Sequence, residues 1–121
     1  MSVEEAIRSL EDISDELRVR AKALGDTQRA LEPVEREYDQ EIDDYELALY
    51  DEAQKNGSRL PAEKVRAQLA HRAMRPELRD RYLMLCAKRD RLRKEISDLK
   101  AAADAQRSIL SAEKTITEAA G

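Results

Sequence analysis

Residues 3–45 read VEEAIRSLEDISDELRVRAKALGDTQRALEPVEREYDQEIDDY, and an apolar side chain returns at every seventh position of this stretch. The repeat consists of Val3, Leu10, Leu17, Leu24, Leu31, Tyr38 and Tyr45. Seven residues make about two turns of an α-helix, so these side chains form one narrow apolar stripe. The stretch therefore predicts a long helix that packs along a coiled-coil seam.

The second half of the chain carries the same spacing, at Leu78, Leu85, Leu92 and Leu99. Between the two runs, Lys55-Asn56-Gly57 is typical of a helix end with glycine in the left-handed conformation. Pro61 followed by Glu63 is typical of the first turn of a new helix. A turn at residues 56–60 should therefore separate two helical arms.

These signals predict an all-α fold, a long antiparallel helical hairpin of the coiled-coil type with proline kinks. Its arms are expected at 3–55 and 61–118, within a single helical domain over residues 1–121. More than about three-quarters of the chain should be helical. Because a two-helix hairpin buries little surface, we expect it to assemble into an oligomeric helix bundle.

Local signals refine the two arms. Ser2 and Glu5 form a capping box, so the first helix should begin near Val3. Pro33 disfavours a helix interior, yet the apolar phase continues past it, which favours a kink in one helix over a complete break. Pro76 should split a short helix at 61–74 from a long one at 76–118. Whether the hairpin is straight or bent at the prolines is left open.

Composition limits the core and the location. The chain has no Phe or Trp and is 40% charged, so a deep globular core is not expected. Cys86 is the only cysteine, and the chain has neither a signal-peptide pattern nor a long apolar run. These features predict a cytoplasmic protein that does not span a membrane.

Two charge blocks of opposite sign lie on the two arms. Residues 26–52 hold eleven Asp or Glu and two Arg, whereas residues 55–94 hold thirteen Lys or Arg and four Asp or Glu. In a hairpin these blocks would neutralise each other, with Arg72 and Arg79 meeting acidic residues such as Asp39. Two alternatives stay open. The basic arm at 64–94 could contact nucleic acid through Arg89 and Arg93, and the acidic row at 35–52 could imitate DNA phosphates.

Apolar residues beside the turn exceed what a two-helix seam can cover. We expect the surplus to form a surface for self-association or for another protein, made of Tyr45, Leu49, Tyr82, Leu83 and Met84. The sequence is compatible with both alternatives, self-association and binding to a different protein.

No chemistry-bearing motif points to catalysis. His71 has no carboxylate at helical spacing, Cys86 has no assigned base, and three glycines in total leave no phosphate-binding loop. Carboxylate metal sites in helical bundles generally include a Glu-x-x-His pair, which this chain lacks. We therefore expect no catalytic residue, no metal and no cofactor, and a non-enzymatic function.

One segment carries a resemblance. Residues 98–114, DLKAAADAQRSILSAEK, together with the proline-interrupted arms, resemble short helical proteins of actinobacterial bacteriophages. The resemblance implies a small phage-encoded accessory or regulatory protein, acting in the host cytoplasm. It implies no activity and no site residue. The function expected from the sequence is a coiled-coil module for protein–protein interaction.

Overall fold

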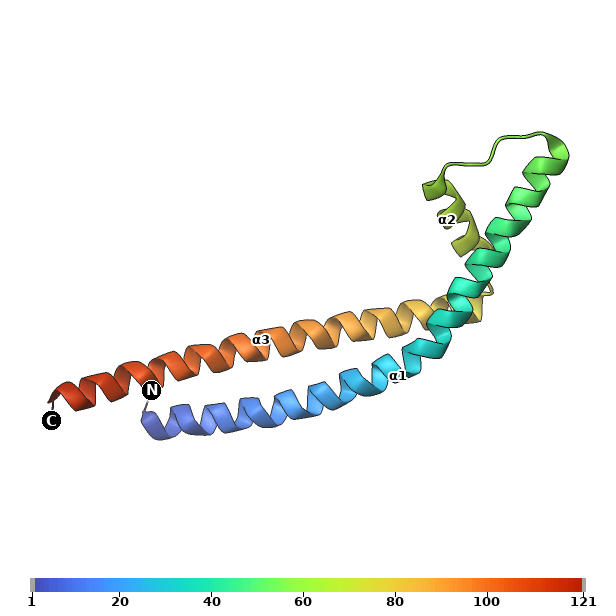
Figure 1. The fold of residues 1–121 in the computed structure, drawn as a ribbon. Coiled ribbons are helices and arrows are strands. Elements are labelled where there is room, and N and C mark those ends of the chain that lie inside the picture. Colours follow the sequence, from blue (N-terminus) through green and yellow to red (C-terminus); the bar gives the residue numbers. More distant parts are fainter. Residues whose placement is uncertain (1, 121) are drawn as a thin grey trace. The chain divides into compact units, whose positions relative to one another are not determined.

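The computed structural model describes residues 2–120 and is all-α (Figure 1). It contains the helices α1 (Val3–Asn56), α2 (Glu63–Ala73) and α3 (Pro76–Ala120), of 54, 11 and 45 residues, and no strand in this part of the chain. The predicted all-α class and the helix content above three-quarters are therefore confirmed.

The start of α1 follows the predicted capping box. The Glu5 amide donates to the Ser2 hydroxyl at 3.1 Å, and the Ser2 amide donates to the Glu5 carboxylate at 3.4 Å. The helix then runs through Pro33 without a break. The alternative of two separate helices on either side of Pro33 is therefore wrong, because the continuing apolar packing outweighs the lost backbone hydrogen bond.

Gly57 follows the last residue of α1 and adopts the left-handed conformation that the sequence predicts for this helix end. Gly57 has a φ of 63°, and the Ser58 amide donates to the Ala53 carbonyl at 3.1 Å, which is the long bond of a Schellman motif. The connection occupies residues 57–62. α2 begins at Glu63, two residues after Pro61, where the Arg66 amide makes its first helical bond to the Ala62 carbonyl.

The predicted split at Pro76 is confirmed. Met74 ends α2 with a ψ of 150°, an extended conformation, and its amide still bonds to the Ala70 carbonyl. Pro76 is the first residue of α3, a position where a missing backbone N–H leaves no hydrogen bond unmade. The buried Met74 side chain lies directly at this break.

The described residues form two compact units. The two-helix unit comprises residues 2–27 and 88–120, where the beginning of α1 and the end of α3 lie side by side (Figure 1). The three-helix unit comprises residues 28–87, which include the rest of α1, all of α2 and the start of α3.

Small residues form much of the seam in the two-helix unit. Its buried side chains are Ala6, Thr27, Leu92 and Ala103. The Thr27 hydroxyl satisfies its hydrogen bond on the Ala23 carbonyl of its own helix, at 2.8 Å. Larger seam residues such as Leu17 are only half-buried. Two helices alone therefore leave this seam partly open to water.

The three-helix unit holds the larger core. Its cluster of buried residues contains Leu31, Val34, Met74, Leu78 and Leu85. Tyr38, Ile42, Tyr82 and Cys86 pack against this cluster and are partly buried. The heptad positions identified in the sequence thus meet the end of α2, which supplies the third side of the core.

Candidate functional site

In the three-helix unit, three helices bring together four side chains that can titrate or act as nucleophiles. Tyr38 of α1 stacks on Tyr82 of α3, with ring centroids 3.9 Å apart and an angle of 15° between the ring planes. The Tyr38 hydroxyl lies 3.0 Å from His71 Nδ1 of α2, although 33 residues separate the two in sequence. Cys86 of α3 lies one turn after Tyr82 and is half-buried.

Burial changes the acidity of both tyrosines. Desolvation by burial, followed by a hydrogen bond with Cys86 and the electrostatic effect of that side chain, raises the pKa of Tyr82 to about 12. Desolvation, followed by the charges of Asp39 and Cys86, also raises the pKa of Tyr38. Both phenols therefore stay protonated in the folded chain at neutral pH.

This cluster joins the three helices of its unit. The hydrogen-bond partner of His71 is a tyrosine hydroxyl and not a carboxylate that would orient it as a base. Residues 2–120 contain no group of three His, Cys, Asp or Glu side chains placed to hold a metal ion. The stacked, hydrogen-bonded rings instead fix the relative placement of the three helices.

The residues predicted to form an interaction surface differ in exposure. Leu83 and Met84 are 47% and 63% exposed. Tyr45 and Leu49 are half-buried, and Tyr82 belongs to the ring stack. The sequence prediction omitted Leu47 and Tyr50, which are 63% and 51% exposed and lie on the same helix as Tyr45. Their signal was the apolar run at 45–50, which covers more than one helix face.

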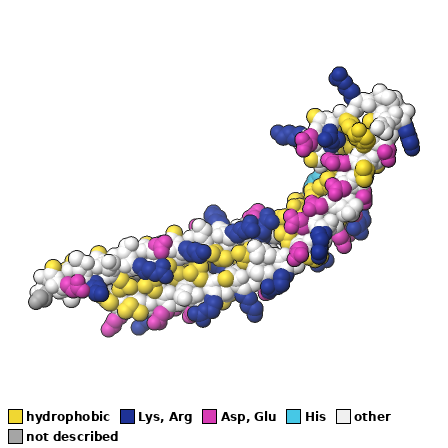
Figure 2. Space-filling model, viewed as in Figure 1, with side chains coloured by type: hydrophobic (Ala, Val, Ile, Leu, Met, Phe, Trp, Pro, Cys, Tyr) yellow, Lys and Arg dark blue, Asp and Glu magenta, His cyan; other side chains and the backbone are white. Residues whose placement is uncertain are grey.

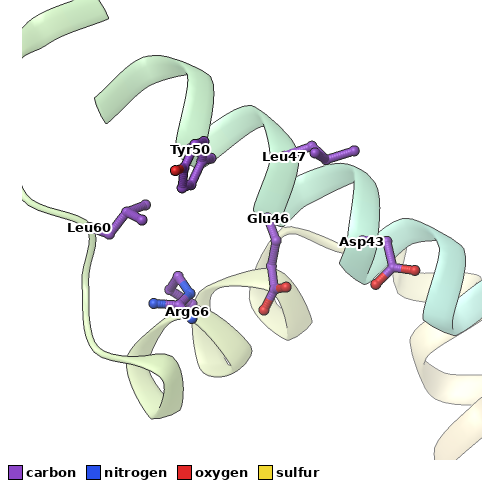
Figure 3. Close-up of a pocket in the computed structure, with 6 residues that line it drawn as sticks. All are labelled: Asp43, Glu46, Leu47, Tyr50, Leu60 and Arg66. Atoms are coloured by element: carbon purple, nitrogen blue, oxygen red, sulfur yellow. The ribbon is translucent and has the colours of Figure 1, made fainter. Parts of the chain in front are cut away.

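An open pocket of about 500 Å³ lies beside Leu47 and Tyr50 (Figure 3). Its lining combines apolar and charged side chains: Asp43, Glu46, Leu47, Tyr50, Leu60 and Arg66. Figure 3 shows Tyr50 of α1 and Leu60 of the 57–62 connection near each other, with Arg66 projecting from α2 below them. Arg66 Nη1 donates to the Pro61 carbonyl at 2.8 Å, which holds the connection against α2.

The opposite charge blocks meet at one arginine of the three-helix unit. Arg75 Nε donates to Glu41 at 2.6 Å, and its Nη2 lies 3.7 Å from Glu37. The hydrogen bond that Arg75 donates to Glu41, together with the charge of that carboxylate, raises the pKa of Arg75. Arg79, expected to face the acidic arm, instead pairs with its sequence neighbour Asp80 at 3.5 Å.

The two arginines of the nucleic-acid alternative lie in the two-helix unit on α3. Arg89 is half-buried, and its Nε pairs with Asp90 at 3.1 Å. Arg93 is exposed. Across the same unit, Arg20 of α1 pairs with Glu95 of α3 at 3.1 Å. Cations of α3 thus lie among carboxylates here as well.

Comparison with protein-family models, with curated proteins and with solved structures finds no match for the chain. Among residues 2–120, no helix combines the length and the apolar character needed to cross a bilayer.

Proposed function

We propose that this protein is a non-enzymatic, coiled-coil module for protein–protein interaction that self-associates. The observation that carries this proposal is the group of exposed apolar side chains in the three-helix unit. Leu47, Tyr50, Leu83 and Met84 each expose about half or more of their surface. Leu47 and Tyr50 line one pocket, and Leu83 and Met84 are neighbours on α3, so the chain has two exposed apolar surfaces. Exposed apolar surfaces mark interaction sites on soluble proteins.

The total surface supports the same proposal. A compact monomer of 13.8 kDa exposes about 6,600 Å², whereas this chain exposes 8998 Å². The difference, about 2,400 Å², exceeds the roughly 800 Å² per partner of a standard interface. No large side chain among residues 2–120 is fully buried. Association with another chain would supply the burial that the isolated chain lacks.

In this proposal the two arms form one antiparallel hairpin, and two hairpins form a helix bundle. The module acts in the cytoplasm, as an accessory or regulatory protein of the kind that the phage resemblance implies. The self-associated module acts by binding another protein.

Mass measurement over a dilution series tests the proposal. Light scattering coupled to size-exclusion chromatography should give a dimer or a higher oligomer that dissociates into the 13.8 kDa chain on dilution. A chain that remains monomeric at its highest soluble concentration would contradict self-association.

Nucleic-acid binding by the basic arm is the competing function. It predicts that the purified protein retains DNA or RNA at low salt and releases it steeply as salt rises. Arg89→Glu with Arg93→Glu should then abolish retention without loss of helicity. We expect no retention, because carboxylates such as Asp90 and Glu95 lie beside the arginines of α3.

A further inference from the structure

We propose that the pocket lined by Leu47, Tyr50 and Leu60 receives Leu83 and Met84 of a second copy of this chain. The contact is reciprocal, so that two copies exchange these side chains and close a dimer. This inference rests on the self-association proposed above and assigns its residues. We call the receiving surface the Tyr50 pocket and the inserted surface the Met84 ridge.

The Tyr50 pocket has the size and the composition of a receptor for side chains. Its volume of about 500 Å³ falls within the roughly 300–1,000 Å³ typical of protein binding pockets. The apolar residues in its lining are Leu47, Tyr50 and Leu60. They are 63%, 51% and 36% exposed, respectively. An occupant would remove this apolar surface from water.

Two carboxylates line the same pocket. Asp43 and Glu46 of α1 make no ion pair within residues 2–120, although the Arg66 guanidinium lies in the same lining. Residues 43–52 contain five Asp or Glu and no Lys or Arg. In Figure 2, Asp and Glu side chains gather with hydrophobic side chains on this unit. The pocket therefore favours an apolar occupant that carries positive charge.

The Met84 ridge has the complementary chemistry. Leu83 and Met84 are 47% and 63% exposed on α3. The carboxylate of Asp80, four positions before Met84, shares the helix face of Met84 and is paired with Arg79. Arg81 precedes Met84 by three positions and Lys88 follows it by four, so both cations lie on this face as well. Both are exposed and form no ion pair within residues 2–120. Methionine is flexible and adapts to the shape of a pocket.

A second copy of the chain is complementary to both surfaces. Each copy presents one acidic apolar pocket and one basic apolar ridge, so a single type of contact, made twice, covers both surfaces in both copies. The contact also brings Asp43 and Glu46 of one chain to Arg81 and Lys88 of the other. Such complementarity selects a register and disfavours contacts between like surfaces.

Single substitutions on each surface provide the first test. Leu47→Lys places a cation in the pocket, where it repels the basic ridge, and Met84→Glu places an anion on the ridge. Each should weaken dimerisation by about 30-fold or more, as expected for truncating a central contact. Sedimentation velocity measures the dissociation constant, and circular dichroism verifies that helicity is retained.

Val19 provides the matched control. It lies in the two-helix unit and is 67% exposed, close to the 63% of Leu47 and Met84. Val19→Lys and Val19→Glu introduce the same charges on an exposed helical position outside both surfaces. Neither should change the dissociation constant by more than about twofold, which is the range of surface substitutions.

Mixing the two variants provides the decisive test. Neither variant alone has an intact pocket facing an intact ridge. A 1:1 mixture restores one such contact, because the ridge of the Leu47→Lys chain can enter the pocket of the Met84→Glu chain. We expect a heterodimer in the mixture and monomers in each separate sample.

Charge reversal gives a second test of the contact, in which no apolar residue is changed. Arg81→Glu with Lys88→Glu should weaken the wild-type dimer, and mixing this chain with Asp43→Lys/Glu46→Lys should restore association. If the single variants dimerise like the wild type, or if the mixtures stay monomeric, the assigned contact is wrong while self-association stands. A monomeric wild type whose pocket binds a basic amphipathic peptide would overturn both self-association and the second copy as occupant.

Discussion

The two units use the same heptad repeat and obtain different cores from it. In the two-helix unit the repeat leaves Leu17 half-buried, whereas in the three-helix unit Leu31 is 3% exposed. The difference is the short helix α2, which adds Met74 and Ala70 as buried residues on the side that two helices leave open. A regular apolar stripe therefore predicts which face is buried. How completely each residue is buried depends on its local neighbours, since Leu92 of the two-helix unit is also only 5% exposed and Tyr45 of the three-helix unit is half-buried.

The largest expected effect is the contrast between Leu31→Ala and Leu17→Ala. Removing the buried Leu31 side chain should lower the free energy of unfolding by about 3 kcal/mol, because a cavity forms in a closed core. Removing the half-buried Leu17 should cost about 1 kcal/mol, because water can reach the vacated space. Urea denaturation measures both changes.

All four tyrosines lie in the three-helix unit, so the same experiment can separate the units. Tyrosine fluorescence follows residues 28–87, and far-ultraviolet circular dichroism follows the whole chain. Leu31→Ala should shift the fluorescence transition strongly. Equal shifts for Leu31→Ala and Leu17→Ala would show that the third helix does not strengthen its unit.

A second prediction concerns alkaline pH and the three-helix unit. The pKa of Tyr82 is raised from 10.0 to about 12, so the folded chain favours the neutral phenol. Its contribution to stability is complete below pH 10 and is lost as pH rises through 12. Tyr82→Phe should therefore flatten the fall in unfolding free energy between those values.

Phenolate absorbance measures this titration directly. Subtracting the Tyr82→Phe curve from the wild-type curve should give a midpoint near pH 12 in the folded chain, and one near the ordinary value of about 10 in urea. Tyr50→Phe, at a 51% exposed residue, is the control for losing one phenol. A folded midpoint near 10 for Tyr82 would contradict its desolvation in the stack.

A third prediction concerns a substitution that should stabilise the two-helix unit. Gln106 of α3 has a buried Oε1 atom with no hydrogen-bond partner among the described residues. Gln106→Leu removes this unpaired group and adds apolar surface to the seam, so it should raise the unfolding free energy by about 1 kcal/mol. The exposed Gln28→Leu is the control and should change stability little. A loss of stability in Gln106→Leu would refute the unpaired state of the amide.

The smallest expected effect concerns the ion pair across the two-helix seam. Arg20 and Glu95 are 31% and 39% exposed at their side chains and lie 3.1 Å apart. Arg20→Glu and Glu95→Arg should each lower the unfolding free energy by about 0.5 kcal/mol, and the double exchange should recover part of this loss. Urea denaturation at low salt measures the cycle. Additive losses in the double variant would show that the two groups do not interact.

Much of the fold follows from local signals in the sequence. Ser2 with Glu5 predicts the start of α1, Gly57 predicts its end and Pro76 predicts the start of α3, because capping and backbone geometry act within a few residues. The heptad positions predict the buried stripe, since helix periodicity fixes which side chains share a face. These features require no knowledge of which helix lies opposite.

Only the tertiary structure decides which residues meet across helices. The sequence identifies Tyr38, His71 and Tyr82 separately. The two tyrosine rings stack only because α1 packs beside α3, and His71 reaches the Tyr38 hydroxyl only because α2 packs beside α1. The sequence likewise places apolar residues at 45–50 without showing that Tyr45 is half-buried while Tyr50 lines a pocket. Periodicity assigns a residue to a helix face, whereas burial and pKa depend on the neighbours that another part of the chain provides.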